Sequence, residues 1–146
     1  MSGNTTCMLS YRDQEAEESR RLDIQHDVLM HVFSGQLLHQ SIPPLQRDSA
    51  IADVATGTGS WLIDVARSFA GYFDKKMRLV GFDISSAKFR KSDEIGVEFV
   101  THDITTPFPP AYHGKFDVVH LRLLAYAIQE QDVSGVVENV MQLLSQ

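Results

Sequence analysis

Apolar positions in the first third of the chain follow a helical rhythm. From residue 13 to residue 39 they recur mostly three or four positions apart, with charged residues between them, which places them on one face of a helix. Ser34-Gly35 can divide this segment into two helices, and Pro43 and Pro44 end it because proline cannot continue a helix. Residues 1–10 are polar and small, so we expect a flexible N-terminus over residues 1–12. The apolar positions of the helical segment are Leu22, Val28, Leu29, Val32 and Phe33.

The rest of the chain alternates short apolar runs with helical segments. The predicted strands are 50–55, 78–84, 97–102 and 116–121. The predicted helices are 60–69, 85–90 and 132–144, with a proline-rich loop at 105–114. One face of the last helix is expected to carry Val133, Val136, Val137, Val140, Met141 and Leu144. Strands that alternate with helices predict an α/β fold with a parallel sheet, and their nearly continuous apolar character fits burial on both faces.

Composition narrows the classes of function. A chain of 146 residues, 43% hydrophobic and 22% charged, fits one globular domain. No apolar run approaches the roughly 20 residues that cross a bilayer, so we expect no membrane association. The net charge of −6 argues against nucleic acid as the main partner. The single cysteine, Cys7, cannot form an internal disulfide, and the N-terminus lacks a secretory pattern, so we expect a cytoplasmic location.

Two glycines, Gly57 and Gly59, stand where the strand at 50–55 turns into a helix. Glycine has no β-carbon, so the turn can be tight and a ligand can approach the backbone. A complete G-x-G-x-x-G pattern is missing, because Ala55 stands two positions before Gly57, and Leu62 stands three positions after Gly59, where glycines would be needed. No Gly-Lys-Ser/Thr follows, which excludes a P-loop. The loop therefore favours a ligand without phosphates.

Acidic residues follow the next two predicted strands. Asp83 ends the strand at 78–84, where a carboxylate can accept hydrogen bonds from both hydroxyls of a ribose. The alternative is a helix N-cap, but a glycine loop and an acid at the same sheet end favour a binding site. Asp103 follows the third strand and either meets the amine of an adenine, with Ile104 against the ring, or forms an Asx turn. Both interpretations remain open.

Taken together, these motifs resemble the class I S-adenosylmethionine (SAM)-dependent methyltransferases, and among them the LaeA-like and UMTA-type enzymes of fungal secondary metabolism. The matching segments are RRLDIQHDV (20–28), IADVATGTGSWLIDVA (51–66), GFDIS (81–85), FVTHDITTPFP (99–109) and FDVVHLRLL (116–124). The resemblance implies a Rossmann-like parallel sheet with N-terminal helices and strand order 3-2-1-4-5-7-6. We expect this chain to hold only the SAM-binding half, strands 1–4, truncated after the fourth strand. Its parts would be the flexible N-terminus, a helical lid at 13–44 and a partial SAM-binding domain at 45–146.

The resemblance also implies a role for each candidate residue, with SAM as the cofactor. Residues expected to face the methionine part are Asp53, Ala55, Thr56, Gly57 and Gly59. Residues expected at the adenosine are Asp83, Ile84, Asp103 and Ile104. Residues expected at the methyl donor and over the site are His120, Leu121, Arg21, Gln25 and His26. Arg122 can equally be a surface, partner or substrate contact.

Histidines are the candidate general bases. His26 is favoured because it lies in the lid motif, and His120 because it ends a strand on the ligand side. A packing role is the alternative for each. No His, Cys or Asp cluster has metal-ligand spacing, so we expect no metal.

The sequence therefore predicts a SAM-dependent methyltransferase-like protein of fungal natural-product biosynthesis with a small-molecule substrate. The alternatives are a truncated pseudo-methyltransferase with a scaffold role, or a cyclase or isomerase on the same fold. Strand 116–121 would be an open sheet edge, and helix 132–144 would lack part of its packing surface. We therefore expect a homo-oligomer, or a complex with a full-length relative, through these two segments.

Overall fold

The computed structural model describes residues 3–70, 77–90, 96–124 and 127–145, with side chains from residue 13 onward. Four parallel strands form one sheet in the order β3-β2-β1-β4. The strands are β1 (Ala50–Val54), β2 (Arg78–Asp83), β3 (Val97–Thr101) and β4 (Val118–Leu121). Their order and direction confirm the predicted α/β parallel sheet.

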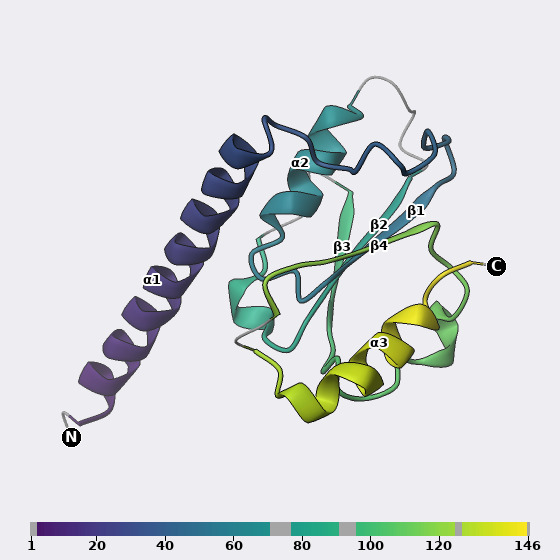
Figure 1. Ribbon diagram of the computed structural model, residues 1–146. Helices are drawn as coiled ribbons and strands as arrows, with labels where there is room; N and C mark the ends of the chain where they lie inside the picture. Colours follow the sequence, from purple (N-terminus) through teal and green to yellow (C-terminus); the bar gives the residue numbers. More distant parts are fainter. Residues whose placement is uncertain (1–2, 71–76, 91–95, 125–126, 146) are drawn as a thin grey trace.

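Helices cover both faces of this sheet (Figure 1). Successive strand residues point to opposite faces, so Ile51 packs with α2 (Ser60–Ser68), and its neighbour Ala52 packs in a second cluster on the other face. That second cluster lies beneath α3 (Val133–Met141) and includes Phe82 and Leu143. The core therefore has two layers, one on each side of the sheet. Short 3₁₀ turns at Ser86–Lys88 (η1), Pro110–Tyr112 (η2) and Glu130–Asp132 (η4) join these elements.

One long helix, α1 (Gly3–Val32), precedes the sheet and runs past α2 (Figure 1). It begins earlier than residue 13, and the second helix expected after Ser34-Gly35 is absent, which corrects the sequence prediction. Ser34 and Gly35 have positive φ values of 53° and 77°, and the Gly35 N–H returns to the Met30 carbonyl at 2.7 Å. A left-handed pair of this kind ends a helix. The division of the chain at residues 12 and 44 stays a prediction.

The last helix differs from its predicted form. Val136 is buried, but Val133, Val137 and Met141 are 45%, 50% and 60% exposed. The expected single apolar face is therefore split, because the sheet contacts one stripe of the helix and leaves the neighbouring stripe open. The polar Asn139 is buried on the inner side, where its amide donates to the Ile104 carbonyl at 3.1 Å.

Strand β4 forms one edge of the sheet within the described part of the chain. Its outer edge is paired only at the start, where Phe116 forms a parallel bridge with Leu144. The Phe116 N–H donates to the Leu143 carbonyl at 3.1 Å, and the Ser145 N–H donates to the Phe116 carbonyl at 2.8 Å. The strand proper consequently begins at Val118, two residues later than predicted. None of the described helices is both long and apolar enough to cross a membrane.

Candidate functional site

A cavity of about 400 Å³ opens at the carboxyl ends of the strands. Ligands of open parallel α/β sheets bind at this end, where the loops after the strands diverge. The cavity is lined by the loop after β1, the ends of β2 and β3, the segment after β4 and one face of α1. The lid predicted from sequence at 13–44 thus contributes a wall through α1.

The loop after β1 follows a left-handed path. Ala55, Gly57 and Gly59 have φ values of 57°, 60° and 79°. The loop is fixed to β2, because the Thr56 N–H donates to the Phe82 carbonyl at 2.9 Å. Ala55, Thr56 and Gly57 line the cavity. A left-handed φ is strained for alanine but not for glycine, so Ala55 holds backbone strain in this loop.

Gly59 has a packing role in this loop. It does not line the cavity, and a β-carbon there would lie 2.4 Å from Cζ of Phe99. The same ring would be 2.8 Å from a β-carbon at Gly81 of β2. The two glycines therefore make room for Phe99, which stacks on Phe89 with ring centroids 4.9 Å apart. Sequence reasoning assigned Gly59 to the ligand because a glycine loop does not reveal which side of the chain is crowded.

Asp83 lies at the end of β2 and joins it to the glycine loop. Its carboxylate is 8% exposed and accepts the Gly57 N–H at 2.8 Å and the Ser85 N–H at 3.1 Å. An ionised carboxylate has about four lone-pair sites, so acceptor capacity remains toward the cavity that Asp83 lines. Ile84, the next residue, is 68% exposed and lines the same cavity.

Asp103 forms the Asx turn that the sequence left open as an alternative. Its Oδ1 accepts the Thr105 N–H at 2.9 Å and the Thr105 hydroxyl at 2.8 Å. The backbone hydrogen bond from Thr105 lowers the pKa of Asp103, which keeps the carboxylate ionised. Its Oδ2 accepts no hydrogen bond from the described residues, and Asp103 and Ile104 both line the cavity. The turn and a ligand contact are therefore compatible.

Asp53 of β1, which is buried, and His120 of β4, which is partly exposed, form a hydrogen-bonded pair. Asp53 accepts the Thr56 hydroxyl at 2.6 Å through Oδ2 and the His120 Nδ1–H at 2.7 Å through Oδ1. The His120 ring stacks on Trp61 with centroids 3.7 Å apart and planes 9° apart. This fixes the tautomer, because a carboxylate can only accept, and it leaves Nε2 without a partner among the described residues. Neither Asp53 nor His120 lines the cavity.

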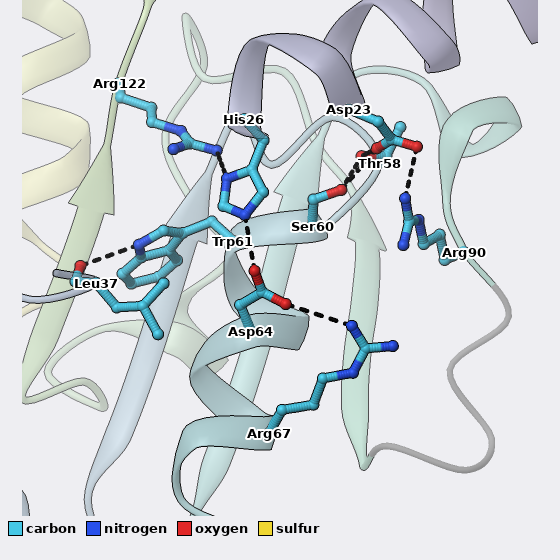
Figure 2. A network of polar contacts seen from close by, with 10 residues as sticks. All are labelled: Asp23, His26, Leu37, Thr58, Ser60, Trp61, Asp64, Arg67, Arg90 and Arg122. Atoms are coloured by element: carbon cyan, nitrogen blue, oxygen red, sulfur yellow. Dashed lines mark hydrogen bonds and ion pairs between the residues drawn. The ribbon is translucent and has the colours of Figure 1, made fainter. Parts of the chain in front are cut away.

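His26 connects three elements (Figure 2). This residue of α1 is 4% exposed, and its Nε2 contacts Asp64 Oδ2 of α2 at 3.0 Å. Its Nδ1 accepts a hydrogen bond from Arg122 Nη2 at 2.8 Å, since a guanidinium has donors only. The proton of His26 is therefore on Nε2, which donates to Asp64. Neither ring nitrogen is free to take a proton from a substrate in this arrangement, so the predicted base role stays a prediction without support from this geometry.

Asp23 forms a second junction, one helical turn before His26 (Figure 2). Its Oδ1 accepts the hydroxyls of Thr58 at 2.7 Å and Ser60 at 2.6 Å, and its Oδ2 accepts Arg90 Nη2 at 2.5 Å. Burial alone would raise the pKa of Asp23, but the hydrogen bonds from these three donors lower it below its ordinary value. The carboxylate therefore remains charged at the N-terminus of α2 and fastens α1 to the glycine loop.

The structure brings most of the predicted residues into one cavity. Predicted residues that line it are Arg21, Gln25, His26, Ala55, Thr56, Gly57, Asp83, Ile84, Asp103 and Ile104. Predicted residues outside its lining are Asp53, Gly59, His120 and Leu121. Residues that the sequence did not assign to it are Glu18, Leu22, Ser60, Lys88, His102, Thr105, Leu123, Leu124, Ala127 and Ile128. The spacing of Glu18, Leu22 and Gln25 on one helical face was an available signal. No metal-binding cluster occurs among the residues that the structure describes.

Known proteins resemble this chain over most of its length. The methyltransferase domain family matches residues 51–146. The methyltransferase grgD of a Penicillium species is 37% identical over 135 residues, covering 88% of this chain and 46% of the relative. The N-methyltransferase gliN of Aspergillus fumigatus is 32% identical over 117 residues, covering 80% of this chain and 38% of the relative. The chain thus spans less than half the length of these curated relatives.

Solved structures show the same fold. A chain from the complex between the Haloferax volcanii Trm112 methyltransferase activator and a methyltransferase superposes with a TM-score of 0.63 at 20% identity. That match covers 92% of this chain and 55% of the other. The matching family domain includes the glycine loop, Asp83 and Asp103, which carry the resemblance drawn from sequence. The chain belongs to the methyltransferase domain family, and its curated relatives include methyltransferases of fungi.

Proposed function

We propose that the cavity binds SAM and that the chain is the cofactor-binding part of a small-molecule methyltransferase. The observation that carries this proposal is the meeting of Gly57, Asp83, Ile84 and Asp103 in one cavity at the strand ends. Asp83 retains acceptor capacity for the ribose hydroxyls, and Ile84 offers an exposed apolar surface to the adenine. The free Oδ2 of Asp103 can accept a hydrogen bond from the adenine amine.

The second support is the negative charge at the place where a dinucleotide would put its phosphates. Dinucleotide-binding folds place a pyrophosphate at the N-terminus of the helix after the glycine loop. Here Asp23 occupies that place with a charged carboxylate, bonded to Thr58 and Ser60. The Gly57 N–H is used by Asp83. A phosphate would be repelled by Asp23, whereas the cationic sulfonium of SAM would not.

When bound, SAM supplies a methyl group on a positively charged sulfur, and the protein has to orient the acceptor and remove its proton. We propose His120 for the proton. Asp53 holds its Nδ1–H, and Trp61 fixes the ring plane, so Nε2 presents a lone pair. His120 lies outside the cavity lining, so the acceptor would approach from the open side of β4. The curated N-methyltransferase relative favours a nitrogen acceptor on a fungal natural product.

Calorimetric titration with S-adenosylhomocysteine (SAH) tests the cofactor. We expect binding by the wild-type chain and loss of at least about 30-fold in affinity for Asp83→Ala, because hydrogen bonds to a charged acceptor contribute about 2 kcal/mol or more. Asp27→Ala, which removes an exposed carboxylate of α1, is the matched control and should bind as the wild type does. A folded protein that gives no heat with SAH would contradict the proposal and favour the scaffold alternative. Binding that survives Asp83→Ala unchanged would mean that the site is misplaced.

Methyl transfer separates the enzyme from a cyclase or isomerase on this fold. The proposed enzyme converts SAM to SAH in the presence of an amine acceptor, and His120→Ala should slow that conversion with little change in SAH affinity. Turnover of an acceptor without consumption of SAM would favour the cyclase or isomerase instead. Because the chain spans less than half of its relatives, the assay includes a full-length relative as a possible partner.

We also propose that the chain associates, either with a second copy or with a full-length relative. Its proposed location is the cytoplasm. The outer edge of β4 has no strand partner beyond Phe116 in the described chain, and α3 exposes Val133, Val137 and Met141. Open sheet edges and exposed apolar stripes are both common interfaces. Light scattering at micromolar concentration should give more than the monomer mass, and Val137→Lys should reduce it. A wild-type chain that stays a monodisperse monomer and does not bind the full-length relative would contradict the proposed association.

A further inference from the structure

We infer that Arg122 binds the carboxylate at the methionine end of the cofactor, and that His26 positions Arg122 for this contact. The inference rests on the proposed SAM site and adds a specificity-determining cation to it. Arg122 follows β4 and lines the cavity together with Gln25 and His26.

The first argument is charge pairing in the cavity wall. Arg21 pairs with Glu18 at 2.7 Å, and Lys88 approaches the same carboxylate at 3.9 Å. Arg122 has no carboxylate at ion-pair distance among the residues that the structure describes, although it is half-buried. Desolvation lowers the pKa of Arg122, and nearby Asp53 offsets this only in part. A half-buried guanidinium without a counter-ion costs free energy, which an anionic ligand recovers.

The second argument is that the carboxylates of the surrounding elements hold other side chains and do not pair with Arg122. Asp53 accepts hydrogen bonds from Thr56 and His120. Asp64 is bonded to His26 and to Arg67. Neither carboxylate forms an ion pair with Arg122 among the described residues.

The third argument is the orientation of the guanidinium. His26 accepts one N–H of Arg122 at 2.8 Å, and Asp64 holds the proton of His26 on the opposite nitrogen (Figure 2). A guanidinium has five N–H donors in a planar fork, so one bond to His26 fixes its direction and leaves the others for a bidentate carboxylate. His26 is thus a positioning residue that acts through Arg122.

The fourth argument is reach. β1 lies between β2 and β4, so the ends of β2 and β4 are roughly 10 Å apart at ordinary strand spacing. If Asp83 at the end of β2 holds the ribose, a methionine portion that lies across the end of β1 would reach the segment after β4, where Arg122 lines the cavity. The carboxylate that Arg122 meets is consequently assigned to the cofactor and not to the acceptor.

Two ligands that differ in this carboxylate test the inference. SAH carries it, whereas methylthioadenosine shares the adenosine and the sulfur but lacks the amino-acid end. Arg122→Met should weaken SAH roughly 10- to 100-fold, the usual loss for charge-assisted hydrogen bonds, and leave methylthioadenosine within about twofold. Arg20→Met, at an exposed position of α1, is the matched control and should change neither affinity. Arg122→Lys keeps the charge but not the fork, and should weaken SAH alone by a smaller factor.

His26 variants test the positioning role. His26→Leu should lower the preference for SAH over methylthioadenosine, and His26→Asn, which keeps an acceptor near the position of Nδ1, should restore part of it. Equal losses for both ligands in Arg122→Met and Arg122→Lys would overturn the inference and make Arg122 structural. Unchanged SAH affinity in both would also overturn it. If the wild-type chain binds neither ligand, the proposed function itself fails, and that result is distinct from the other two.

Discussion

The two ends of the cavity are built in different ways. At the end where we propose that adenosine binds, here called the adenosine end, Asp83 accepts the Gly57 N–H, and the Thr56 N–H donates to the Phe82 carbonyl of β2. The opposite end, here called the lid end, is formed by α1 and the segment after β4. Its side chains come from segments far apart in sequence, and Arg122 and His26 are separated by 96 positions. The first end is set once the sheet forms. The second is complete only when α1 has docked.

This difference separates two kinds of failure. Substitutions at the adenosine end should lower the stability of the whole domain, because the loop at that end is hydrogen-bonded to strand β2 of the sheet. Damage to the lid end should free α1 and weaken ligand binding while the sheet stays folded. The predictions below test whether the two ends behave in these separate ways.

Gly59→Ala should have the largest effect on stability. The new β-carbon would lie 2.4 Å from Phe99 at a φ of 79°, so both strain and overpacking apply. We expect a loss of about 3 kcal/mol, or a fall in Tm of roughly 10 °C. Gly35→Ala is the matched control, because Gly35 has a φ of 77° but no atom within 4 Å of the new carbon. It should lose only about 1 kcal/mol. Equal losses in calorimetric unfolding would contradict the role assigned to Phe99.

Asp23→Ala should act at the lid end instead. The change leaves Thr58, Ser60 and Arg90 without their shared acceptor. We expect local opening of α1 to become easier by about 2 kcal/mol, with a much smaller change in global stability. Amide hydrogen exchange measures this as faster exchange in α1 than in the strands. Asp27→Ala on the same helix serves as the control. Uniform loss of protection across sheet and helix would show that the two ends are a single unit.

The Asp23 junction should also depend on pH. Hydrogen bonding lowers the pKa of Asp23 in the folded chain, so its contribution is complete above the unfolded pKa of about 4 and is lost as pH falls through the folded value. The stability difference between the wild type and Asp23→Asn should be constant from about pH 5 to 7 and shrink below about pH 4. Thermal unfolding over this range measures it. A difference that grows on acidification would have the wrong sign for a carboxylate with a lowered pKa.

The meeting of Asp83 and Asp103 in one cavity could be predicted from sequence, because each acid is placed by the single strand that it ends or follows. Each apolar run that forms β2 or β3 is followed by an acid, and the strand ends of a parallel sheet meet at one edge. The order of these runs therefore placed Asp83 and Asp103 in one site. The same reasoning predicted the α/β class and strand positions to within one or two residues.

The lid end could not be predicted in this way. Nothing in the spacing of α1 shows that His26 meets Arg122, since periodicity describes one element and not which distant side chain faces it. The last helix shows the same limit: its periodicity is real, but Val137 and Met141 are exposed because only the sheet decides which stripe is covered. Asp53 and His120 were expected at the ligand from their position at the strand ends, whereas they bond to each other and neither lines the cavity.

Ala55→Gly should give the smallest effect, and it is a gain. Ala55 has a left-handed φ of 57° in the loop that begins the adenosine end, and glycine removes that strain. After the entropy that glycine costs in the unfolded chain, we expect about 0.5–1 kcal/mol of added stability, or roughly 2–4 °C in Tm. Ser34→Gly, at a φ of 53° outside the cavity, should gain a similar amount. SAH affinity should stay within about twofold of the wild type for Ser34→Gly, which is remote from the ligand. An increase in SAH affinity for Ala55→Gly alone would show that the Ala55 methyl group crowds the cofactor. A loss of stability would mean that this loop is not strained and that the Ala55 side chain itself stabilises the adenosine end.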